Sequence, residues 1–264
     1  MCEFFYAHSK QDGLDRSTLR TVLKAAQRAA LTNPHGTGIF NEDGVVFRTD
    51  RPIDGELTDR IIPLFEGSEK VVVHLRMATR GARDLTNVHP FVGDGLMLAH
   101  NGQVHGLNEY GDSSDADSKM LLRKITAQSG DTIEKVQEAL STTTGWLSIF
   151  LLNRRTGDLY YFRDGADLYV RESEELVVGA TKRTRIEGAV ESPESNVVYL
   201  LDDGFTPVAE FETSGFSRGS GRSGGRGHSF GEPYRYDGFY REAWGDLEQD
   251  GAWRSTQNQE AAEG

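Results

Sequence analysis

The sequence predicts an α+β fold in which antiparallel strands pack in layers against about four helices. Many short apolar segments are separated by glycine-containing turns, and strands joined by such short turns must run antiparallel. Amphipathic segments with helical spacing are interspersed among them. The chain has 264 residues, which suffices for one good-sized domain with a real core.

The first half begins with a strand, expected at residues 4–8. A helix follows, for which Ser17 is the expected N-cap and Asn33-Pro34 the end. Its apolar face is formed by Leu19, Val22, Leu23, Ala26 and Ala30. Further strands are expected at 36–40, 45–49, 71–77 and 96–99, with a helix at 57–65 and a long polar loop at 78–90.

The second half starts with two amphipathic helices, expected at residues 117–127 and 131–140. The rest is rich in strands, with turns at Thr156-Gly157, Asp164-Gly165 and Asp203-Gly204. The expected strands are 146–152, 159–163, 168–171, 176–179, 197–201 and 208–211.

The composition changes abruptly near residue 214, which predicts a folded domain over residues 2–212 and a mostly disordered tail over 213–264. Residues 214–231 are too rich in Gly and Ser to build a core. Residues 232–264 mix acidic and aromatic side chains. An exposed tail is the expected state, and a segment that docks on a partner is the alternative.

Charge and hydropathy exclude several classes of protein. Forty-one acidic against 29 basic residues give a net charge of −12, which argues against nucleic acid as a partner. The bases divide into 22 Arg and 7 Lys, which suggests a halophilic source or an ordinary acidic cytosolic protein. No apolar run approaches the roughly 18–20 residues of a membrane helix, and the first residues lack a basic leader. We therefore expect a cytoplasmic protein without membrane segments.

The only cysteine is Cys2, directly after the initiator methionine. A single cysteine excludes an internal disulfide framework and a multi-cysteine zinc site. Removal of Met1 would leave Cys2 with a free α-amine of pKa about 7.7–8.0 beside a thiol of pKa about 8.5. One residue could then supply both nucleophile and base. The alternative is a cysteine that lies at this position by chance.

Four segments further along the chain give this cysteine a context. They are His74–Gly81 (HLRMATRG), Asn87–Phe91 (NVHPF), Leu98–Gly102 (LAHNG) and Asp115–Lys119 (DADSK). With Cys2 they resemble, in order and spacing, the glutaminase domain of class II glutamine amidotransferases, which are N-terminal-nucleophile hydrolases. The resemblance covers roughly residues 2–212 and implies a four-layer αββα sandwich of two antiparallel sheets between helices.

The resemblance also implies residue roles. Cys2 would be the nucleophile, and Asn101 with Gly102 would form the oxyanion hole. Arg76 would hold the α-carboxylate of glutamine, for which a planar guanidinium is well suited, and Asp117 its α-ammonium. The residues expected to shape the substrate pocket are Thr79, Met77 and His89.

Each of these residues also has a simpler interpretation. Arg76 could form a surface ion pair, Asp117 could cap a helix, and Asn101-Gly102 could be a two-residue hairpin turn. The histidines could suggest a metal site, but no carboxylate accompanies them at ligand spacing, and neither metal nor cofactor is expected. The chain departs from the family pattern at Glu3, Met77, Arg80 and Lys119.

The function implied is hydrolysis of L-glutamine to glutamate and ammonia through a Cys2 thioester. Ammonia release alone is wasteful, so we expect an ammonia-accepting synthetase on a separate chain; amidation of a 7-deazaguanine nitrile is one guess at its reaction. Two alternatives remain: an amidase or γ-glutamyl hydrolase of the same fold, and a non-catalytic binding or structural relative.

Overall fold

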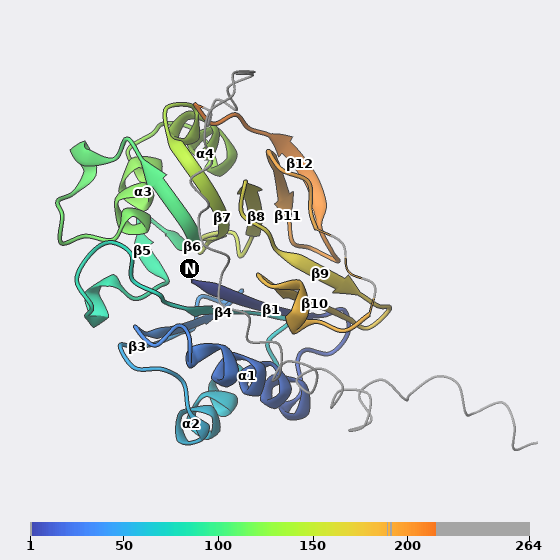
Figure 1. Cartoon of the computed structure of the whole chain (residues 1–264). Coiled ribbons are helices and arrows are strands. Elements are labelled where there is room, and N and C mark those ends of the chain that lie inside the picture. Colours follow the sequence, from blue (N-terminus) through green and yellow to red (C-terminus); the bar gives the residue numbers. More distant parts are fainter. Residues whose placement is uncertain (1, 189, 191, 215–264) are drawn as a thin grey trace, which may run out of the picture.

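Two six-stranded sheets lie against each other, and each carries a pair of helices on its outer face (Figure 1). The structure is a computed structural model that describes residues 2–188, 190 and 192–214. Within that range every pair of neighbouring strands in the two sheets runs antiparallel. The α+β class and the αββα layering predicted from the sequence are thereby confirmed.

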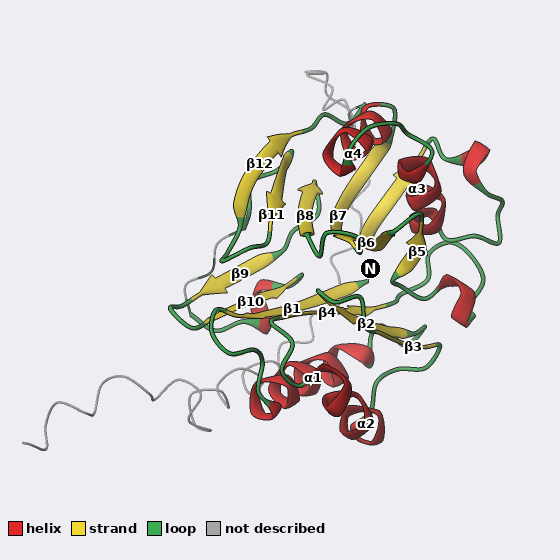
Figure 2. Cartoon of the chain, turned by 180° about the vertical axis from the view of Figure 1, so that it is seen from behind, coloured by secondary structure: helices red, strands yellow, loops and turns green. Residues whose placement is uncertain are grey.

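The first sheet has the strand order β3-β2-β4-β1-β10-β9 and carries helices α1 and α2 (Figure 2). Its elements are β1 (Glu3–Ser9), α1 (Arg16–Ala30), β2 (Thr37–Asn41), β3 (Val46–Thr49), α2 (Gly55–Phe65), β4 (Lys70–Leu75), β9 (Tyr169–Glu172) and β10 (Leu176–Ala180). The short helix η3 (Arg183–Arg185) follows β10.

The second sheet has the order β12-β11-β8-β7-β6-β5 and carries α3 and α4. Its elements are β5 (Phe91–Gly93), β6 (Leu96–His105), α3 (Asp117–Thr126), α4 (Thr132–Ser141), β7 (Thr144–Asn153), β8 (Leu159–Asp164), β11 (Val197–Leu200) and β12 (Thr206–Glu210). The short helices η1 (Leu85–Asn87) and η2 (Asn108–Tyr110) lie in the loops on either side of β5 and β6.

Alternation along β1 shows how the layers are built. Phe5 and Ala7 belong to the apolar cluster under α1 and α2, whereas Phe4 and Tyr6 belong to the cluster between the two sheets. Successive side chains of a strand point to opposite faces, so a strand buried on both faces is apolar at nearly every position. Residues Phe4 to Ala7 are all apolar or aromatic and all buried, as a strand covered on both faces requires. A third cluster packs the second sheet against α3 and α4.

The structure corrects several local expectations. Asp15, not Ser17, caps α1, because its side chain accepts a hydrogen bond from the Thr18 N–H at 2.7 Å. The strand expected at 96–99 continues to His105, since β7 pairs with it along that whole length. Asn101-Gly102 therefore lies inside a strand and is no hairpin turn. The three-residue strand β5 was not predicted.

Residues 215–264 lie outside the described part of the chain, and the prediction of a disordered tail falls on them. The domain boundary near 212 accordingly remains a prediction. Among the helices of the described residues, none combines the length and the apolar character that crossing a bilayer requires.

Candidate functional site

Cys2 lies immediately before β1, beside the end of β4. The antiparallel register pairs Glu3 with Leu75, so the start of β1 meets the chain segment that follows β4. The Cys2 Sγ atom accepts a hydrogen bond from the Met77 N–H at 3.3 Å and lies 3.7 Å from the Met77 carbonyl oxygen. Two predicted site residues separated by 75 positions are thus in contact.

The environment of the thiol holds it in its neutral form. Burial raises the pKa of the Cys2 thiol above its ordinary value, and the negative charge of Asp117 acts in the same direction. The Met77 backbone hydrogen bond and the charge of Arg76 lower that pKa, but by less. Nucleophilic use of the sulfur therefore requires a base that removes its proton. The same interactions show that Arg76 and Asp117 both act electrostatically on the thiol.

Arg76 is buried, with 2% of its surface exposed, so the surface ion pair considered above is wrong. Its guanidinium donates hydrogen bonds to the carbonyl oxygens of Ala82 at 2.9 Å and Arg80 at 3.2 Å. The loop after β4 is thereby wrapped around this side chain. Burial lowers the pKa of Arg76. Thr79 lies in the same loop with its side chain exposed, while Met77 is half-buried.

Asn101 and Gly102 lie in the middle of β6, opposite Ser148 and Leu147 of β7. Asn101 is 1% exposed, and its side-chain oxygen has no hydrogen-bond partner among the described residues. Gly102 has a φ of +150°, and a Cβ built there would lie 2.1 Å from the Trp146 carbonyl oxygen. Only glycine fits this position, because any side chain would collide with the neighbouring strand.

Asp117 is the first residue of α3, and Ala116 is its N-cap, so the expectation of a capping aspartate is corrected by one position. One carboxylate oxygen accepts a hydrogen bond from the Val104 N–H at 3.1 Å, which ties α3 to β6 two residues after Gly102. The adjacent Ser118 hydroxyl lies 2.8 Å from Nδ1 of His100. The HNG segment and the start of α3 therefore form one hydrogen-bonded unit.

His89 lies behind the site in a group of buried histidines. Its ring centroid is 3.9 Å from that of His74 and 4.6 Å from that of Phe91. His74 Nε2 lies 3.1 Å from the His100 carbonyl oxygen, so this histidine bridges the two sheets. Burial lowers the pKa of His89 well below its ordinary range, and that of His74 to about 3. Among the described residues, no group of three or more His, Cys, Asp or Glu side chains is placed to hold a metal ion.

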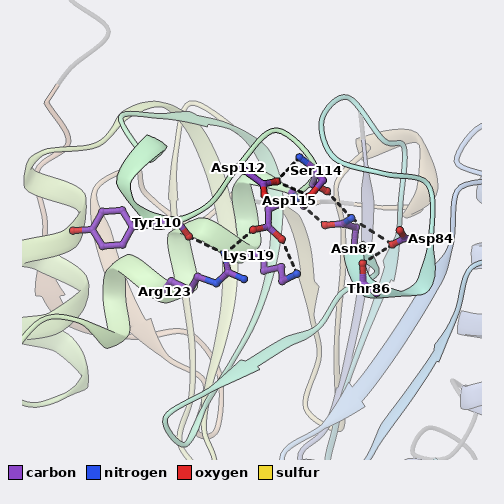
Figure 3. A network of polar contacts seen from close by, with 10 residues as sticks. Asp84, Thr86, Asn87, Tyr110, Asp112, Ser114, Asp115, Lys119 and Arg123 are labelled. Atoms are coloured by element: carbon purple, nitrogen blue, oxygen red, sulfur yellow. Dashed lines mark hydrogen bonds and ion pairs between the residues drawn. The ribbon is translucent and has the colours of Figure 1, made fainter.

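The loops that enclose the site are joined by residues to which the sequence analysis gave no role. Asn87 accepts a hydrogen bond from the Ala116 N–H at 2.7 Å and donates one to the Ser114 carbonyl oxygen at 3.0 Å (Figure 3). His35 Nδ1 accepts from the Ala78 N–H at 2.9 Å. Asn87 belongs to the Asn87–Phe91 segment of the sequence motifs. Its role was missed because a hydrogen bond between two loops leaves no periodic pattern in the sequence.

Lys119, one of the departures from the family pattern, has a local partner. Its Nζ atom lies 2.7 Å from Asp115, whose other oxygen lies 2.6 Å from Arg123 (Figure 3). The lysine therefore belongs to an ion-pair network on the first turns of α3.

A separate groove of about 1440 Å³ lies between α4 and the ends of β7, β8, β11 and β12. Acidic side chains and Trp146 line it, and it includes none of the predicted catalytic or substrate-binding residues. Volume alone does not identify a site, and the predicted site residues lie instead where β1, β4, β6 and α3 meet. In both overall views, β1 starts close to β5 and β6 of the second sheet (Figures 1 and 2).

Comparisons with known proteins give the family of the chain. Residues 22–185 match the family described as glutamine amidotransferases class-II; Cys2 lies outside the matched range. The chain is 26% identical over 149 residues to a glutamine–fructose-6-phosphate aminotransferase of Helicobacter pylori, covering 52% of this chain and 25% of that protein. The same enzyme of Mesorhizobium japonicum is 26% identical over 145 residues, covering 50% and 23%. The chain thus spans about a quarter of these relatives.

Solved structures share the fold at low sequence identity. A glutamine phosphoribosylpyrophosphate amidotransferase from B. subtilis superposes with a TM-score of 0.59 and 17% identity, over 80% of this chain and 49% of the other. An allosteric regulatory enzyme of purine biosynthesis gives 0.63 and 16% over the same shares. A glutamine aminotransferase class-II domain protein from Silicibacter pomeroyi gives 0.51 and 14%, over 80% and 99%. Since the family match covers more than half of the chain, the protein belongs to the class II glutamine amidotransferases.

Proposed function

We propose that the chain hydrolyses L-glutamine to glutamate and ammonia, with Cys2 as the nucleophile. The observation that carries the proposal is the contact between Cys2 and the segment after β4, which puts the only thiol of the chain within electrostatic reach of Arg76 and Asp117. A cation and an anion near a nucleophile are suited to a free amino acid, whose two α-substituents carry opposite charges.

In the proposed reaction, the α-amine of Cys2, freed by removal of Met1, accepts the thiol proton. The thiolate attacks the side-chain carbonyl carbon of glutamine, and the oxyanion is stabilised by the Asn101 amide and the Gly102 N–H. The amine then protonates the departing nitrogen, ammonia leaves, and a γ-glutamyl thioester remains. Water, deprotonated by the same amine, hydrolyses the thioester to glutamate and restores the thiol.

The carboxamide of Asn101 supports this role. Nothing in the described residues binds its oxygen, so the group can turn to direct its N–H toward a substrate without breaking a bond to the protein. Asp117 accepts from the Val104 N–H through Oδ2 and from the Ser118 N–H through Oδ1. The carboxylate is partly exposed, and since its two oxygens offer about four acceptor sites, it keeps capacity for an ammonium.

The direct test is the Cys2→Ala variant, assayed for glutamate release from glutamine. Loss of a nucleophile should reduce kcat by about 10³-fold or more. Intact mass measurement must show that Met1 is absent from the parent protein. A Cys2→Ala variant as active as the parent would refute the proposal, as would an active parent that retains Met1. Hydrolysis of amides that lack the α-carboxylate or the α-amine would instead indicate a different amide hydrolase.

We further propose that the ammonia passes to an acceptor enzyme on a separate polypeptide, because release of ammonia alone would consume glutamine without forming an aminated product. Affinity purification of the full chain should recover a synthetase whose product forms with glutamine as nitrogen donor. Product formation that proceeds equally with the Cys2→Ala variant would contradict this coupling.

A further inference from the structure

Glu3, the residue after the proposed nucleophile, is a buried carboxylate with four hydrogen bonds to side chains. It is 1% exposed. Arg185 donates to both of its oxygens, from Nε at 3.1 Å and from Nη2 at 3.2 Å, and Arg185 itself is 2% exposed. Lys182 Nζ lies 2.5 Å and Asn33 Nδ2 lies 3.0 Å from the same oxygen, Oε1. The negative charge on the residue after Cys2 is thus neutralised by two cations.

Glu3 and Cys2 face opposite sides of the first sheet. The partner Asn33 follows α1, which covers the outer face of that sheet, and its amide also bonds to the Ala29 carbonyl oxygen at the end of the helix. Phe4 lies in the cluster between the sheets, and alternation along the strand places Cys2 on the same side as Phe4. The Glu3 carboxylate therefore stays out of the reaction centre, although it is adjacent to it in sequence.

The first residues of β1 are paired with a strand on one side only, because β10 ends before it reaches them. Other contacts must therefore fix this end of β1. β10 pairs with β1 only as far as Phe5, opposite Ala180. Beyond that point the chain after β10 continues the contact: the Phe4 N–H donates to the Thr181 hydroxyl at 2.8 Å, and the Thr181 N–H donates to the Phe4 carbonyl oxygen at 3.2 Å. Lys182 and Arg185 then bind Glu3. Segment 181–185 thus replaces the β1–β10 strand pairing at the residues next to Cys2.

Stability alone is a weak reason for burying this charge. Replacing a buried ion pair by apolar groups of similar volume is often neutral or stabilising, whereas its fixed geometry can specify one arrangement. The contacts of the thiol itself are weak: the Cys2 Sγ atom accepts from the Met77 N–H at 3.3 Å and lies 3.7 Å from the Met77 carbonyl oxygen. The position of Cys2 therefore depends on how firmly its neighbour in the chain is held.

We propose that Glu3 is a positioning residue, and that the clamp formed by Glu3, Asn33, Thr181, Lys182 and Arg185 fixes the Cys2 thiol against the end of β4 for attack on the substrate. The inference rests on the proposed function in taking Cys2 as the nucleophile. It assigns a role to an acidic residue that, from the sequence alone, counted as a departure from the family pattern.

The test compares two clamp variants with a matched control in the full chain. Glu3→Gln removes the charge that pairs with Arg185, and Thr181→Val removes the acceptor of the Phe4 N–H with little change in shape. The control is Glu42→Gln, because the Glu42 carboxylate accepts from the Glu69 and Lys70 N–H groups at 2.7 and 2.8 Å, at the opposite end of β4. Intact mass confirms that all variants share the same N-terminus.

Three quantities are measured: kcat and KM for glutamine, the melting temperature, and the rate at which iodoacetamide alkylates the only cysteine. A misplaced nucleophile should lower kcat about tenfold with KM changed less than about twofold, and a loosened thiol should react several times faster with the alkylator. The Glu42→Gln variant should keep both rates within about twofold of the parent, whatever its melting temperature.

Clamp variants that melt at lower temperature but keep the parent kcat and alkylation rate would overturn the proposal, since the cluster would then serve stability alone. If Glu3→Gln does not fold, Thr181→Val decides by the same criteria. If the parent hydrolyses no glutamine, the proposed function fails, and the alkylation rates of the folded variants still decide whether the clamp positions the thiol.

Discussion

The two sheets contribute different kinds of groups to the candidate site. On the first sheet, the Arg76 guanidinium donates to two carbonyl oxygens of its own loop, and the Cys2 sulfur accepts from Met77. On the second sheet, the Asn101 side-chain oxygen is buried without a partner among the described residues. Of these three site residues, Arg76 and Cys2 are held by internal hydrogen bonds, whereas the Asn101 oxygen retains unused hydrogen-bonding capacity. Capacity left unused in a buried place points to where a ligand would bind.

The difference between bonded and unbonded buried polar groups affects the free energy of unfolding, which can be measured. A buried polar group without a partner costs about 1–3 kcal/mol of stability, while one with a partner stabilises or is neutral. Residues of the second sheet that serve a substrate should therefore be separable from residues that serve the fold, because their replacement lowers activity without lowering stability.

The largest effect is expected for Asn101→Ala. Loss of an oxyanion donor should lower kcat for glutamine hydrolysis by about 10²–10³-fold, with little change in the melting temperature, since the lost oxygen has no partner in the described structure. The control is Ser148→Ala, directly opposite in β7, where the Ser148 hydroxyl lies 3.0 Å from that of Tyr161. It should cost about 1 kcal/mol of stability and leave kcat nearly unchanged. Equal losses of stability in both variants would contradict the contrast.

Gly102→Ala should combine both effects, because this position joins the site to the β6–β7 ladder. The added Cβ would lie 2.1 Å from the Trp146 carbonyl oxygen and must displace backbone, at a cost of about 1–3 kcal/mol and a large part of the activity. Gly55→Ala, with no atom within 4 Å of the new Cβ, is the control and should be neutral or slightly stabilising. Urea unfolding measures the loss of stability, and glutamate release measures the loss of activity. A Gly102→Ala protein with the stability of the parent would show that β6 and β7 move apart here at little cost.

Acid should weaken the contact between the sheets. The pKa of His74 is lowered by burial to about 3, below its unfolded value near 6.5, so the unfolded chain binds the proton first. This contribution is fully present above pH 6.5 and is lost as the pH falls toward 3; at pH 5 the loss is about 2 kcal/mol. Urea unfolding at pH 7 and pH 5 measures it. In His74→Gln the difference between the two pH values should shrink by that amount, and an unchanged difference would show that His74 does not contribute.

The smallest effect is expected for Asp115→Asn, which removes the ion pairs with Lys119 and Arg123 (Figure 3). Both cations are partly exposed, so the loss of stability should be about 1 kcal/mol or less and should diminish with added salt. Thermal unfolding at low and high salt checks this. A loss as large as that of Gly102→Ala would mean that the ion pairs organise the second side of the site more than their exposure indicates.

Much of the fold was readable from local patterns. The turns between 146 and 211 predicted antiparallel pairing, and the apolar spacing predicted the four α-helices at nearly their observed positions. Cys2 and the four motif segments predicted the family, which the comparisons confirm. The roles of Arg76, Asp117 and His89 toward a substrate remain predictions.

The sequence by itself determined the order of elements, the antiparallel layers and the identity of the residues that could carry the chemistry, because these depend on spacing within short segments. Only the tertiary structure decided that Asn101 and Gly102 lie within a strand, that the Arg76 guanidinium binds its own loop, and that Glu3 is neutralised by Lys182 and Arg185. The reason is that these outcomes depend on partners 6 to 182 positions away, and distant segments meet only when the sheets form.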